Sequence, residues 1–459
     1  MSVGETIYPR LPQIVQSGIL NVEAWRIQRR RFGRDFDRAL RDAESRSYAS
    51  ADALRHHRRS RLASYLVYCS RTVPFYRRWF QENAIDPRRD DVDVIVRRLP
   101  IVTKREVKAA LHDYASEAAP RDQRLVHTSG TTGEGFRFFV SPDVLHEQWA
   151  VWWRYRRWHG LSLNTWCGYF GGRSVVPIDQ QEPPFWRINY AGRQVMFSGY
   201  HLSSENLRHV VGELNRRRPP WLHGYPSLLA LVAAHVLDRG GLEYQPRWIT
   251  TGAENLLPQQ RTLIARAFGV TPRQHYGHAE AVANVSECER GRLHVDEDFS
   301  DFELVAGGDG SSARIVGTSF SNLAMGFVRY DTGDLARWSP ETCDCGRAGR
   351  VISGVDGRNE DYVVLKNGAR LGRLDHVFKD MVHVREAQIH QRRRGELTLR
   401  IVRGEGFGSS DEERLLREIH ARVGRDAEVT VEYVTALERS ERGKLRFVIS
   451  ELSEGRCAA

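Results

Sequence analysis

The stretch His127–Phe139 reads HTSGTTGEGFRFF. It holds three glycines and four Ser or Thr residues, a composition that neither a helix nor a strand favours. Glycine lets the backbone approach a ligand closely, and successive N–H groups and hydroxyls can converge on an anion such as a polyphosphate. The stretch therefore predicts a loop that binds nucleotide phosphates.

Two other loop types compete with this prediction. The Walker loop requires Gly-x-x-x-x-Gly-Lys-[Ser/Thr] before a helix, whereas here residues 136–140 read as a strand. A hairpin loop rich in turn residues fits the stretch as well as a phosphate loop does when the stretch is taken alone. Motifs elsewhere in the chain have to decide between these two.

The composition describes a large folded protein. The chain has 459 residues, 41% of them hydrophobic and 11 of them Trp, which favours two or three domains over disorder. Its net charge of +10 comes largely from arginine. The arginines between Arg26 and Arg41 alternate with acidic residues from Asp35 to Glu44 at helical spacing, which predicts a solvated amphipathic helix rather than a nucleic-acid arm.

We expect neither a signal peptide nor a membrane-spanning segment. The N-terminus lacks the basic-then-apolar pattern of a signal peptide, and the run Leu228–Leu237 is too short to span a bilayer. No nucleic-acid module is recognisable either. We therefore expect a soluble cytoplasmic protein that binds neither membranes nor nucleic acid.

Several helices are expected before residue 160. Residues 1–60 look like a polar helical extension, and a second helical region follows over 51–80. Thr103 is a candidate N-cap for a helix after Leu99–Lys104, and Ser141-Pro142 starts another helix. That helix carries Trp149, Trp152, Trp153, Tyr155 and Trp158, a stripe that we expect to be buried in the core rather than to line a substrate site.

Strands and helices alternate in the middle of the chain. This order predicts an α/β domain with a largely parallel sheet, whose ligands lie at the carboxyl ends of strands. Two loops fall at such ends, Thr251–Glu254 and His275–Glu280. The expected strands are 167–170, 248–251 and 271–275, and the expected helices are 204–214, 226–237 and 258–268.

After Phe302 the pattern becomes more β-like, with strands expected at 313–316, 326–330 and 351–352. From Asp361 the order is strand, helix, strand, strand, helix, strand, over 362–365, 374–381, 385–391, 397–402, 411–423 and 428–434. Such a unit forms a compact α+β domain. We therefore predict a helical extension over 1–60, a large domain over 61–357 and a small C-terminal domain over 361–459, with a hinge at 357–361.

Four separated motifs occur in a fixed order: Thr128–Gly133 (TSGTTG), Tyr276–Glu280 (YGHAE), Tyr330–Asp334 (YDTGD) and Gly443-Lys444. Together they resemble the adenylate-forming superfamily of acyl-CoA synthetases, adenylation domains and luciferases. Leu99–Lys104, Gly224–Ser227 and Gly252–Glu254 make the closer resemblance one to the phenylacetate-CoA ligase branch. The resemblance covers roughly residues 60–450.

The resemblance implies a two-step ligase reaction with ATP, Mg²⁺ and CoA. A carboxylic acid attacks the α-phosphorus of ATP to give an acyl- or aryl-adenylate and pyrophosphate, and CoA then takes the acyl group as a thioester. Two alternatives stay open: transfer to an amine, a hydroxyl or a carrier-protein thiol in a biosynthetic pathway, or a nucleotide-binding homologue without ligase activity. Retention of Lys444 argues against the last of these. The acid, the acceptor and the oligomeric state are not specified by the sequence, and a homodimer is one arrangement that it allows.

The same resemblance assigns roles to individual residues. Lys444 and Glu280 are the expected catalytic residues: Lys444 reaches the carboxylate oxygen and the α-phosphate, and Glu280 is an oxygen ligand for Mg²⁺. Asp334 is expected to accept both ribose hydroxyls from a strand end, and Arg358 to contact ribose or phosphate. The full set of expected nucleotide-binding residues is Thr128, Ser129, Gly130, Thr131, Thr132, Gly133, Gly252, Ala253, Glu254, Tyr276, Gly277, Asp334 and Arg358.

Three details of the resemblance concern moving or substituted parts. The family loop often ends in Pro-Lys, whereas here Arg137 follows, and the sequence does not decide whether Arg137 replaces that lysine. A short linker at Asn359-Glu360 suits rotation of the small domain, which would bring Lys444 in for adenylation and remove it for transfer. The acid is expected near Tyr169, Gly171, His223 and Tyr225.

A second set of residues is independent of ATP. Cys288 and His294 are separated by five residues and Cys343 and Cys345 by one, and three thiolates with one imidazole make a closed tetrahedral zinc set. Unrelated buried thiols are the alternative. Because Cys343–Arg347 is rich in turn residues and offers little core to fill, we favour structural Zn²⁺. The remaining cysteines, Cys69, Cys167 and Cys457, have no partner by spacing.

Overall fold

The computed structural model describes most of the chain. The described residues are 8, 11–128, 136–172, 175–177, 180–203, 205–256, 258–306, 313–356, 363–366, 370–371, 374, 377, 383–404, 406–424, 427–435, 437 and 448–452. Among them, no helix combines the length and the apolar character needed to cross a membrane.

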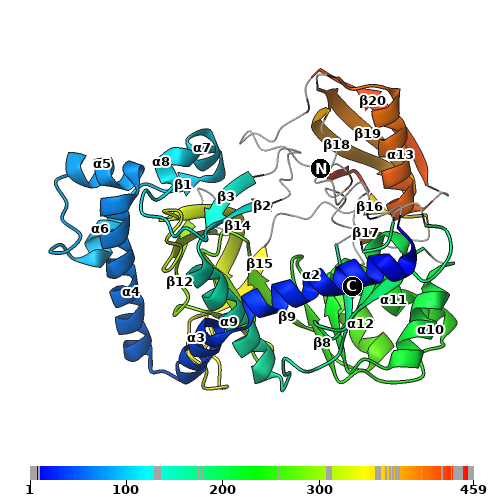
Figure 1. The fold of residues 1–459 in the computed structure, drawn as a ribbon, viewed down its shortest axis with the longest axis horizontal. Coiled ribbons are helices and arrows are strands. Elements are labelled where there is room, and N and C mark those ends of the chain that lie inside the picture. The colour runs from blue at the N-terminus through cyan, green and yellow to red at the C-terminus, as the bar shows by residue number, and fades with distance from the viewer. Residues whose placement is uncertain are drawn as a thin grey trace.

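One large sheet organises the molecule (Figure 1). Within the described residues it has 13 strands in the order β12-β13-β14-β15-β11-β10-β9-β8-β7-β4-β6-β5, with β1 paired to β14. Its strands are β1 (Val102–Thr103), β4 (Cys167–Gly171), β5 (Trp186–Asn189), β6 (Gln194–Ser198), β7 (Trp221–Gly224), β8 (Trp248–Thr251), β9 (Arg273–Gly277), β10 (Asn284–Glu287), β11 (Leu293–Val295), β12 (Ser300–Ala306), β13 (Ala313–Ser319), β14 (Tyr330–Trp338) and β15 (Val351–Asp356).

The two halves of this sheet differ in strand direction. Strands β6, β4, β7, β8 and β9 are parallel, which confirms the α/β half that the alternation of strands and helices predicts. The other half, from β9 to β12, is antiparallel. The helices beside the parallel half are η2 (Gly199–His201), α10 (Leu207–Arg217), α11 (Pro226–Arg239) and α12 (Pro258–Phe268).

Helix α9 (Pro142–Trp158) packs across the junction of the two halves. It begins at Pro142 as expected, but the Ser141 hydroxyl donates to the Ser321 carbonyl oxygen at 2.9 Å instead of capping the helix. Of the expected buried stripe, Trp153 and Tyr155 are buried, whereas Trp149, Trp152 and Trp158 stay partly exposed. The stripe is therefore only partly a core feature.

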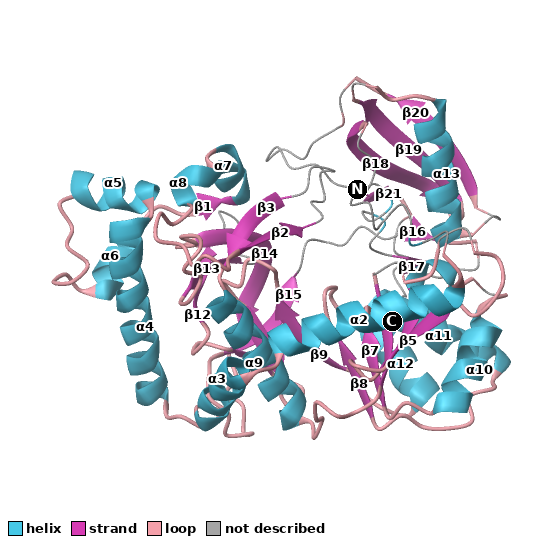
Figure 2. Ribbon diagram, in the orientation of Figure 1, coloured by secondary structure: helices cyan, strands magenta, loops and turns pink. Residues whose placement is uncertain are grey.

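The N-terminal helices pack against this large body. They are α2 (Gln13–Arg31), α3 (Arg34–Ser45), α4 (Ala51–Thr72), α5 (Pro74–Glu82), α6 (Val92–Arg98), α7 (Lys104–Ala109) and α8 (Leu111–Tyr114). Phe36 and Leu40 of α3 are buried against Trp153 of α9, and α2 runs across the front of the view in Figure 2 towards α11. The expected boundary after residue 60 falls inside α4, so this helix continues across it.

Local sequence signals determine where two of these helices begin. Thr103 caps α7 as predicted: its hydroxyl accepts from the Glu106 N–H, and the Glu106 carboxylate accepts from the Thr103 N–H at 2.7 Å. Pro74 opens α5, where its missing N–H costs no hydrogen bond.

The glycine-rich stretch His127–Phe139 is framed by a hairpin. Strand β2 (Arg124–Thr128) pairs antiparallel with β3 (Phe136–Val140), so that Thr128 lies opposite Phe136. Phe136, Phe138 and Val140 are buried, which anchors β3 in the core. The residues between the two strands, 129–135, lie outside the described part.

The C-terminal part forms a second sheet, in the order β20-β19-β18-β21. Helix α13 (Ser409–Val423) covers it, with Leu415 and Ile419 packed against Ile389 and Leu399 (Figure 1). The strands of this part are β16 (Val363–Val364), β17 (Arg370–Leu371), β18 (Val384–Arg393), β19 (Glu396–Arg403), β20 (Glu428–Tyr433) and β21 (Val448–Ser450). The predicted hinge at 357–361 and most of the predicted helix at 374–381 lie outside the described residues.

Two sequence expectations are corrected. The expected strand 326–330 was wrong, because β14 starts only at Tyr330 and continues through Asp334 to Trp338. The two strands β5 and β6 were not predicted. Both are short, with four and five residues, and β6 lacks an alternation of apolar and polar residues, whereas the alternation in β5 was overlooked.

Candidate functional site

Three of the expected segments meet at one edge of the parallel half-sheet. Strands β7, β8 and β9 run parallel and in register, so the residues that follow their carboxyl ends lie next to one another. At this edge Gly252 lies against His275, so closely that a Cβ on it would come within 2.7 Å of the imidazole ring. The Glu254 carboxylate accepts from the Ser227 N–H at 3.1 Å, which ties the loop after β8 to the start of α11.

Glu280 follows this edge and is held as an anion. Its carboxylate accepts from the Tyr330 hydroxyl at 3.1 Å and contacts His278 Nδ1 at 3.1 Å. Burial acts to raise the pKa of Glu280, but the hydrogen bond and charge of His278 and the charge of Lys104 outweigh it and lower the pKa to about 2. A buried, ionised carboxylate is a suitable oxygen ligand for Mg²⁺.

Asp334 lies beside Tyr276 because β14 is irregular there. Asp331 pairs with Val316 and Leu335 with Arg314, so three residues of β14 face a single residue of β13. Gly333 takes a φ of +80° within this bulge, a conformation that other residues rarely adopt. The bulge places the Asp334 carboxylate where the Tyr276 hydroxyl donates to it at 2.8 Å.

This geometry corrects the expectation that Asp334 ends a strand: it lies within β14. The bulge is held by short hydrogen bonds of the YDTGD motif itself. The Gly333 N–H donates to Asp331 at 2.9 Å, and the Asp334 N–H donates to the Thr332 hydroxyl at 3.1 Å. The spacing of polar residues in this motif is therefore the spacing that a bulge needs.

Lys104, which has no role assigned from the sequence, lies beside Phe136, the first described residue after the predicted phosphate loop. The Lys104 ammonium is 5.5 Å from the centroid of the Phe136 ring, where β3 leaves the loop, and its charge acts on Glu280. Arg137, the residue considered as a substitute for the family's lysine, is exposed on β3. The signal that could have identified Lys104 is its place at the end of the LPIVTK motif, directly at the N-terminus of α7.

Several predicted residues are not placed by the structure. Thr128 ends β2, and the loop residues Ser129, Gly130, Thr131, Thr132 and Gly133 lie outside the described residues, as do Arg358 and Lys444. The described residues therefore bring together Gly252, Ala253, Glu254, Tyr276, Gly277, Glu280 and Asp334, and the assignments for the rest stay predictions.

The expected acid-binding residues lie on two neighbouring strands. Tyr169 of β4 is paired in register with His223 of β7, and the two rings are 5.8 Å apart. His223 Nδ1 contacts the Thr250 carbonyl oxygen at 3.0 Å and its hydroxyl at 2.8 Å. Gly171 lies under the Tyr169 ring, and the Tyr225 N–H donates to the Phe170 carbonyl oxygen at 2.9 Å. All four predicted residues thus lie at or near the carboxyl ends of β4 and β7.

A second cluster of side chains comes from the residue after β10, from β11 and from the segment between β14 and β15. The potential ligand atoms of Cys288, His294, Cys343 and Cys345 all lie within 4.8 Å of one another. The Cys288 and Cys343 sulfurs are 3.7 Å apart, and His294 Nε2 is 3.4 Å from the Cys345 sulfur. Tetrahedral bonds to zinc would separate two sulfurs by about 3.8 Å and a sulfur from a nitrogen by about 3.5 Å. The predicted four residues are therefore gathered with the spacing of a metal site.

The surroundings of this cluster suit a metal as well. His294 Nδ1 contacts the Ala348 carbonyl oxygen at 3.2 Å, which leaves Nε2 facing the sulfurs. Burial acts to raise the pKa of the Cys288 thiol, but hydrogen bonds with His294 and with the backbone at Arg292 outweigh it and lower the pKa to about 7. Among the described residues the other two cysteines, Cys69 and Cys167, are buried in separate core clusters.

Known proteins resemble this chain over most of its length. The chain is 23% identical to Protein CapK of Staphylococcus aureus, over 97% of this chain and 99% of that protein. It is 26% identical to the phenylacetate-coenzyme A ligase of Thermus thermophilus, over 87% and 96%, and 26% identical to that of Pseudomonas putida, over 72% and 76%. The family model for the CapK C-terminal domain matches residues 364–451.

A solved structure shares the fold. The 2-hydroxyisobutyryl-CoA ligase in complex with 2-HIB-AMP and CoA superposes with a TM-score of 0.56 at 19% identity, over 88% of this chain and 91% of that one. The chain shares the fold of this ligase, and its sequence is similar to those of phenylacetate-coenzyme A ligases.

Proposed function

We propose that this protein is an ATP-dependent, AMP-forming ligase that activates a carboxylic acid as its acyl- or aryl-adenylate and transfers the acyl group to CoA. The observation that carries the proposal is the meeting of three motifs at one sheet edge. The loop Gly252–Glu254, the ionised Glu280 and the Tyr276–Asp334 pair come together there, on three separate parts of the chain. Relatives in the same branch are named phenylacetate-coenzyme A ligases.

Each of these groups has a distinct task in the proposed reaction. Asp334 accepts hydrogen bonds from the ribose hydroxyls, and Tyr276 flanks the adenine together with residues 252–254. Glu280 holds Mg²⁺, whose charge stabilises the phosphates during transfer. Lys104 adds a cation beside Phe136, and the loop 128–133 binds the phosphates through N–H groups and hydroxyls.

The small domain completes the site in this proposal. Lys444 neutralises the charge that develops between the acid and the α-phosphate, and Arg358 contacts ribose or phosphate. The domain over 361–459 turns about the hinge at 357–361 between adenylation and transfer. We place the enzyme in the cytoplasm, where ATP and CoA are its substrates.

One observation favours a second class of acceptor for the acyl group. The relative that matches over 97% of this chain is Protein CapK, a name that specifies no CoA acceptor, and the family model over 364–451 carries the same name. Under this alternative the adenylate passes to an amine, a hydroxyl or a carrier-protein thiol. The mass of the product formed with and without CoA separates the two.

Acid-dependent exchange of pyrophosphate into ATP tests the activation step. We expect exchange with at least one acid of a broad panel and its loss in Lys444→Ala, because the adenylation transition state then lacks its cation. No exchange with any acid would refute the ligase and favour a nucleotide-binding homologue.

We also propose that Cys288, His294, Cys343 and Cys345 bind a structural Zn²⁺. The sulfur–sulfur and sulfur–nitrogen distances fit tetrahedral zinc, and the contact of His294 Nδ1 with the Ala348 carbonyl oxygen orients the imidazole. Metal analysis of the purified protein is expected to give one zinc per chain, and Cys343→Ser is expected to lose it. Cys457→Ser is the matched control. Stoichiometric zinc in Cys343→Ser would refute the four-ligand site.

A further inference from the structure

Arg156 on helix α9 is a buried cation without an acceptor. Its side chain belongs to a residue only 4% exposed, and its Nε and Nη1 atoms have no hydrogen-bond partner. No carboxylate of the described residues forms an ion pair with it. Instead its guanidinium lies among three indole rings, at 5.1 Å from the centroid of Trp153, 5.4 Å from that of Trp221 and 6.0 Å from that of Trp149.

Such an arrangement is costly in an apoprotein. Removing a charged group from water is unfavourable unless hydrogen bonds and an opposite charge replace the water. Burial lowers the pKa of Arg156 to about 10, so the side chain is still a cation at neutral pH. The indole rings offset part of the cost by cation–π attraction, but they accept none of its N–H bonds. The Trp153 Nε1 next to it is a further buried donor without a partner.

Arg156 faces the strands that carry the expected acid-binding residues. Trp221 begins β7, and two residues further along the strand is His223, whose ring is 5.5 Å from that of Trp221. Burial, the charge of Arg156 and His275 lower the pKa of His223 well below its usual value, so His223 stays neutral. Tyr169 and His223 remain partly exposed although they lie between helix and sheet.

Arg156 lies well away from the sheet edge at which the nucleotide is expected to bind. On α9, Gln148 donates to the His278 carbonyl oxygen at 2.8 Å beside the nucleotide loops, and Arg156 lies eight residues further along, about 12 Å at 1.5 Å per residue. On β7, the start at Trp221 lies three residues before Gly224, about 10 Å at 3.3 Å per residue. Both spacings place the Cα atoms of Arg156 and Trp221 roughly 10 Å below the edge where the carboxylate is activated, and the guanidinium lies beside the Trp221 ring.

We propose that Arg156 recognises a second carboxylate on the substrate, so that the acid activated by this enzyme is a dicarboxylic acid whose two acidic ends are roughly 10 Å apart. This inference rests on the proposed function, because it specifies the acid of that reaction. One carboxylate reacts at the sheet edge near Glu280 and Gly252. The other accepts the unsatisfied N–H bonds of Arg156, and the aromatic side chains of Trp152, Tyr169 and His223 flank the body of the molecule.

Matched pairs of acids test this inference by binding alone. The panel contains 4-carboxyphenylacetate with phenylacetate, 4-carboxycinnamate with cinnamate, and octanedioate with octanoate, each titrated into the protein by calorimetry without ATP. We expect at least one dicarboxylate to bind on the order of ten- to a hundredfold more tightly than its monocarboxylate, the gain from charged hydrogen bonds. Equal affinities in every pair, including no binding by any acid, would overturn the inference.

Two variants on the same helix identify the group responsible. Arg156→Met is expected to abolish the preference for the dicarboxylate while keeping the volume of the side chain. Arg157→Met is the matched control, because Arg157 is exposed and pairs with Glu44 at 2.9 Å on the surface. A preference that survives in Arg156→Met would overturn the assignment. If Arg156→Met does not fold, the wild-type panel still decides whether a second carboxylate is preferred.

The exchange assay separates this inference from the proposed function. Exchange driven equally well by both members of every pair would leave the ligase standing and overturn the role of Arg156. Conversely, an Arg156-dependent preference in binding without any exchange would support the carboxylate site and refute the ligase.

Discussion

Arg154 and Arg156 occupy the same turn of α9, and both are almost fully buried, at 3% and 4% exposed. Their surroundings are opposite. Arg154 donates to both Asp298 carboxylate oxygens, at 2.7 and 3.0 Å, to Asp296 at 2.6 Å and to the Ala43 carbonyl oxygen at 2.9 Å. Arg156 has indole rings around it and no acceptor. The charge of Arg154 is balanced by two carboxylates of the chain, and only its Nε lacks an acceptor, whereas Arg156 has no carboxylate partner among the described residues.

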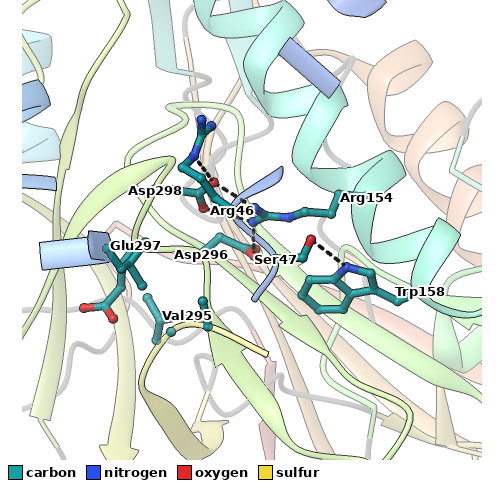
Figure 3. A pocket seen from close by; sticks show the side chains of 11 residues that line it. Arg46, Ser47, Arg154, Trp158, Val295, Asp296, Glu297 and Asp298 are labelled. Atoms are coloured by element: carbon teal, nitrogen blue, oxygen red, sulfur yellow. Dashed lines mark hydrogen bonds and ion pairs between the residues drawn. The ribbon is translucent and has the colours of Figure 1, made fainter. Parts of the chain in front are cut away.

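Helix geometry explains how neighbours in sequence reach such different environments. Residues two apart on an α-helix point about 200° apart, so the two side chains leave α9 on opposite sides. Arg154 points to the segment between β11 and β12, where Arg46 also donates to Asp298 (Figure 3). Arg156 points to the starts of β4 and β7. A buried ion pair is therefore a structural feature here, and a buried unpaired cation indicates a ligand.

The largest expected effect comes from removing the paired arginine. Arg154→Met leaves Asp296 and Asp298 buried with fewer partners, and breaking a buried ion pair in this way costs about 3–5 kcal/mol. We expect the free energy of unfolding, measured by urea denaturation, to fall by about that amount. A variant as stable as the wild type would show that the network contributes nothing to folding.

The ion pair of Arg154 and Asp298 predicts that the stability of the protein depends on pH. Burial acts to raise the pKa of Asp298, but the charge and hydrogen bonds of Arg154 and then Arg46 lower it to about 2, below the usual 3.8. A carboxyl whose pKa is depressed in the folded state stabilises the protein above its unfolded pKa, and this contribution is lost as the pH falls through the folded pKa.

In Arg154→Met the pKa of Asp298 is expected to return towards its usual value. The stability difference between the variant and the wild type should then shrink by roughly 2 kcal/mol between pH 5 and pH 2. Urea titrations at a series of pH values measure it. A difference that stays constant across this range would contradict the assignment of the low pKa to Arg154.

The sequence predicted the framework of the site well, because its signals are local. The parallel strands near 167–170 and 248–251 follow from the alternation of strands and helices, and the gathering of three cysteines and His294 follows from the ligand chemistry of Cys and His. Thr103 and Glu106 show the capping box that their spacing indicates. Each of these features depends on residues whose type alone limits where they can lie.

Contacts between segments that are far apart in the chain could not be predicted from the sequence. The bulge that turns Asp334 towards Tyr276 depends on the register between β13 and β14, and the nearness of Lys104 to Glu280 depends on the packing of α7. One signal for Arg156 was present but unused. It lies three residues after Trp153 and seven after Trp149, on the same face of the helix. An arginine on an otherwise aromatic face predicts a buried cation.

Replacing the unpaired Arg156 should not lower the free energy of unfolding, in contrast to replacing Arg154. Arg156→Met replaces a buried cation without an acceptor by an apolar side chain of similar length, which removes a desolvation cost and keeps the packing. We expect the free energy of unfolding of the apoprotein to stay the same or rise by about 1 kcal/mol. Urea denaturation without ligand measures this. A loss comparable to that of Arg154→Met would mean that Arg156 holds the fold together and does not await a ligand.

The smallest effect should come from the third arginine of the run. Arg157 is 42% exposed in its side chain and pairs with the Glu44 carboxylate at 2.9 Å on the surface. An exposed ion pair contributes little, because water screens it and two long side chains are immobilised, so Arg157→Met should change stability by less than about 1 kcal/mol. Urea denaturation of this variant sets the baseline for the other two. A loss of several kcal/mol in Arg157→Met would show that apolar packing of the arginine side chain, and not its charge, stabilises this helix. Arg154 and Arg156 would then have to be compared through Lys substitutions, which keep the charge and change the shape.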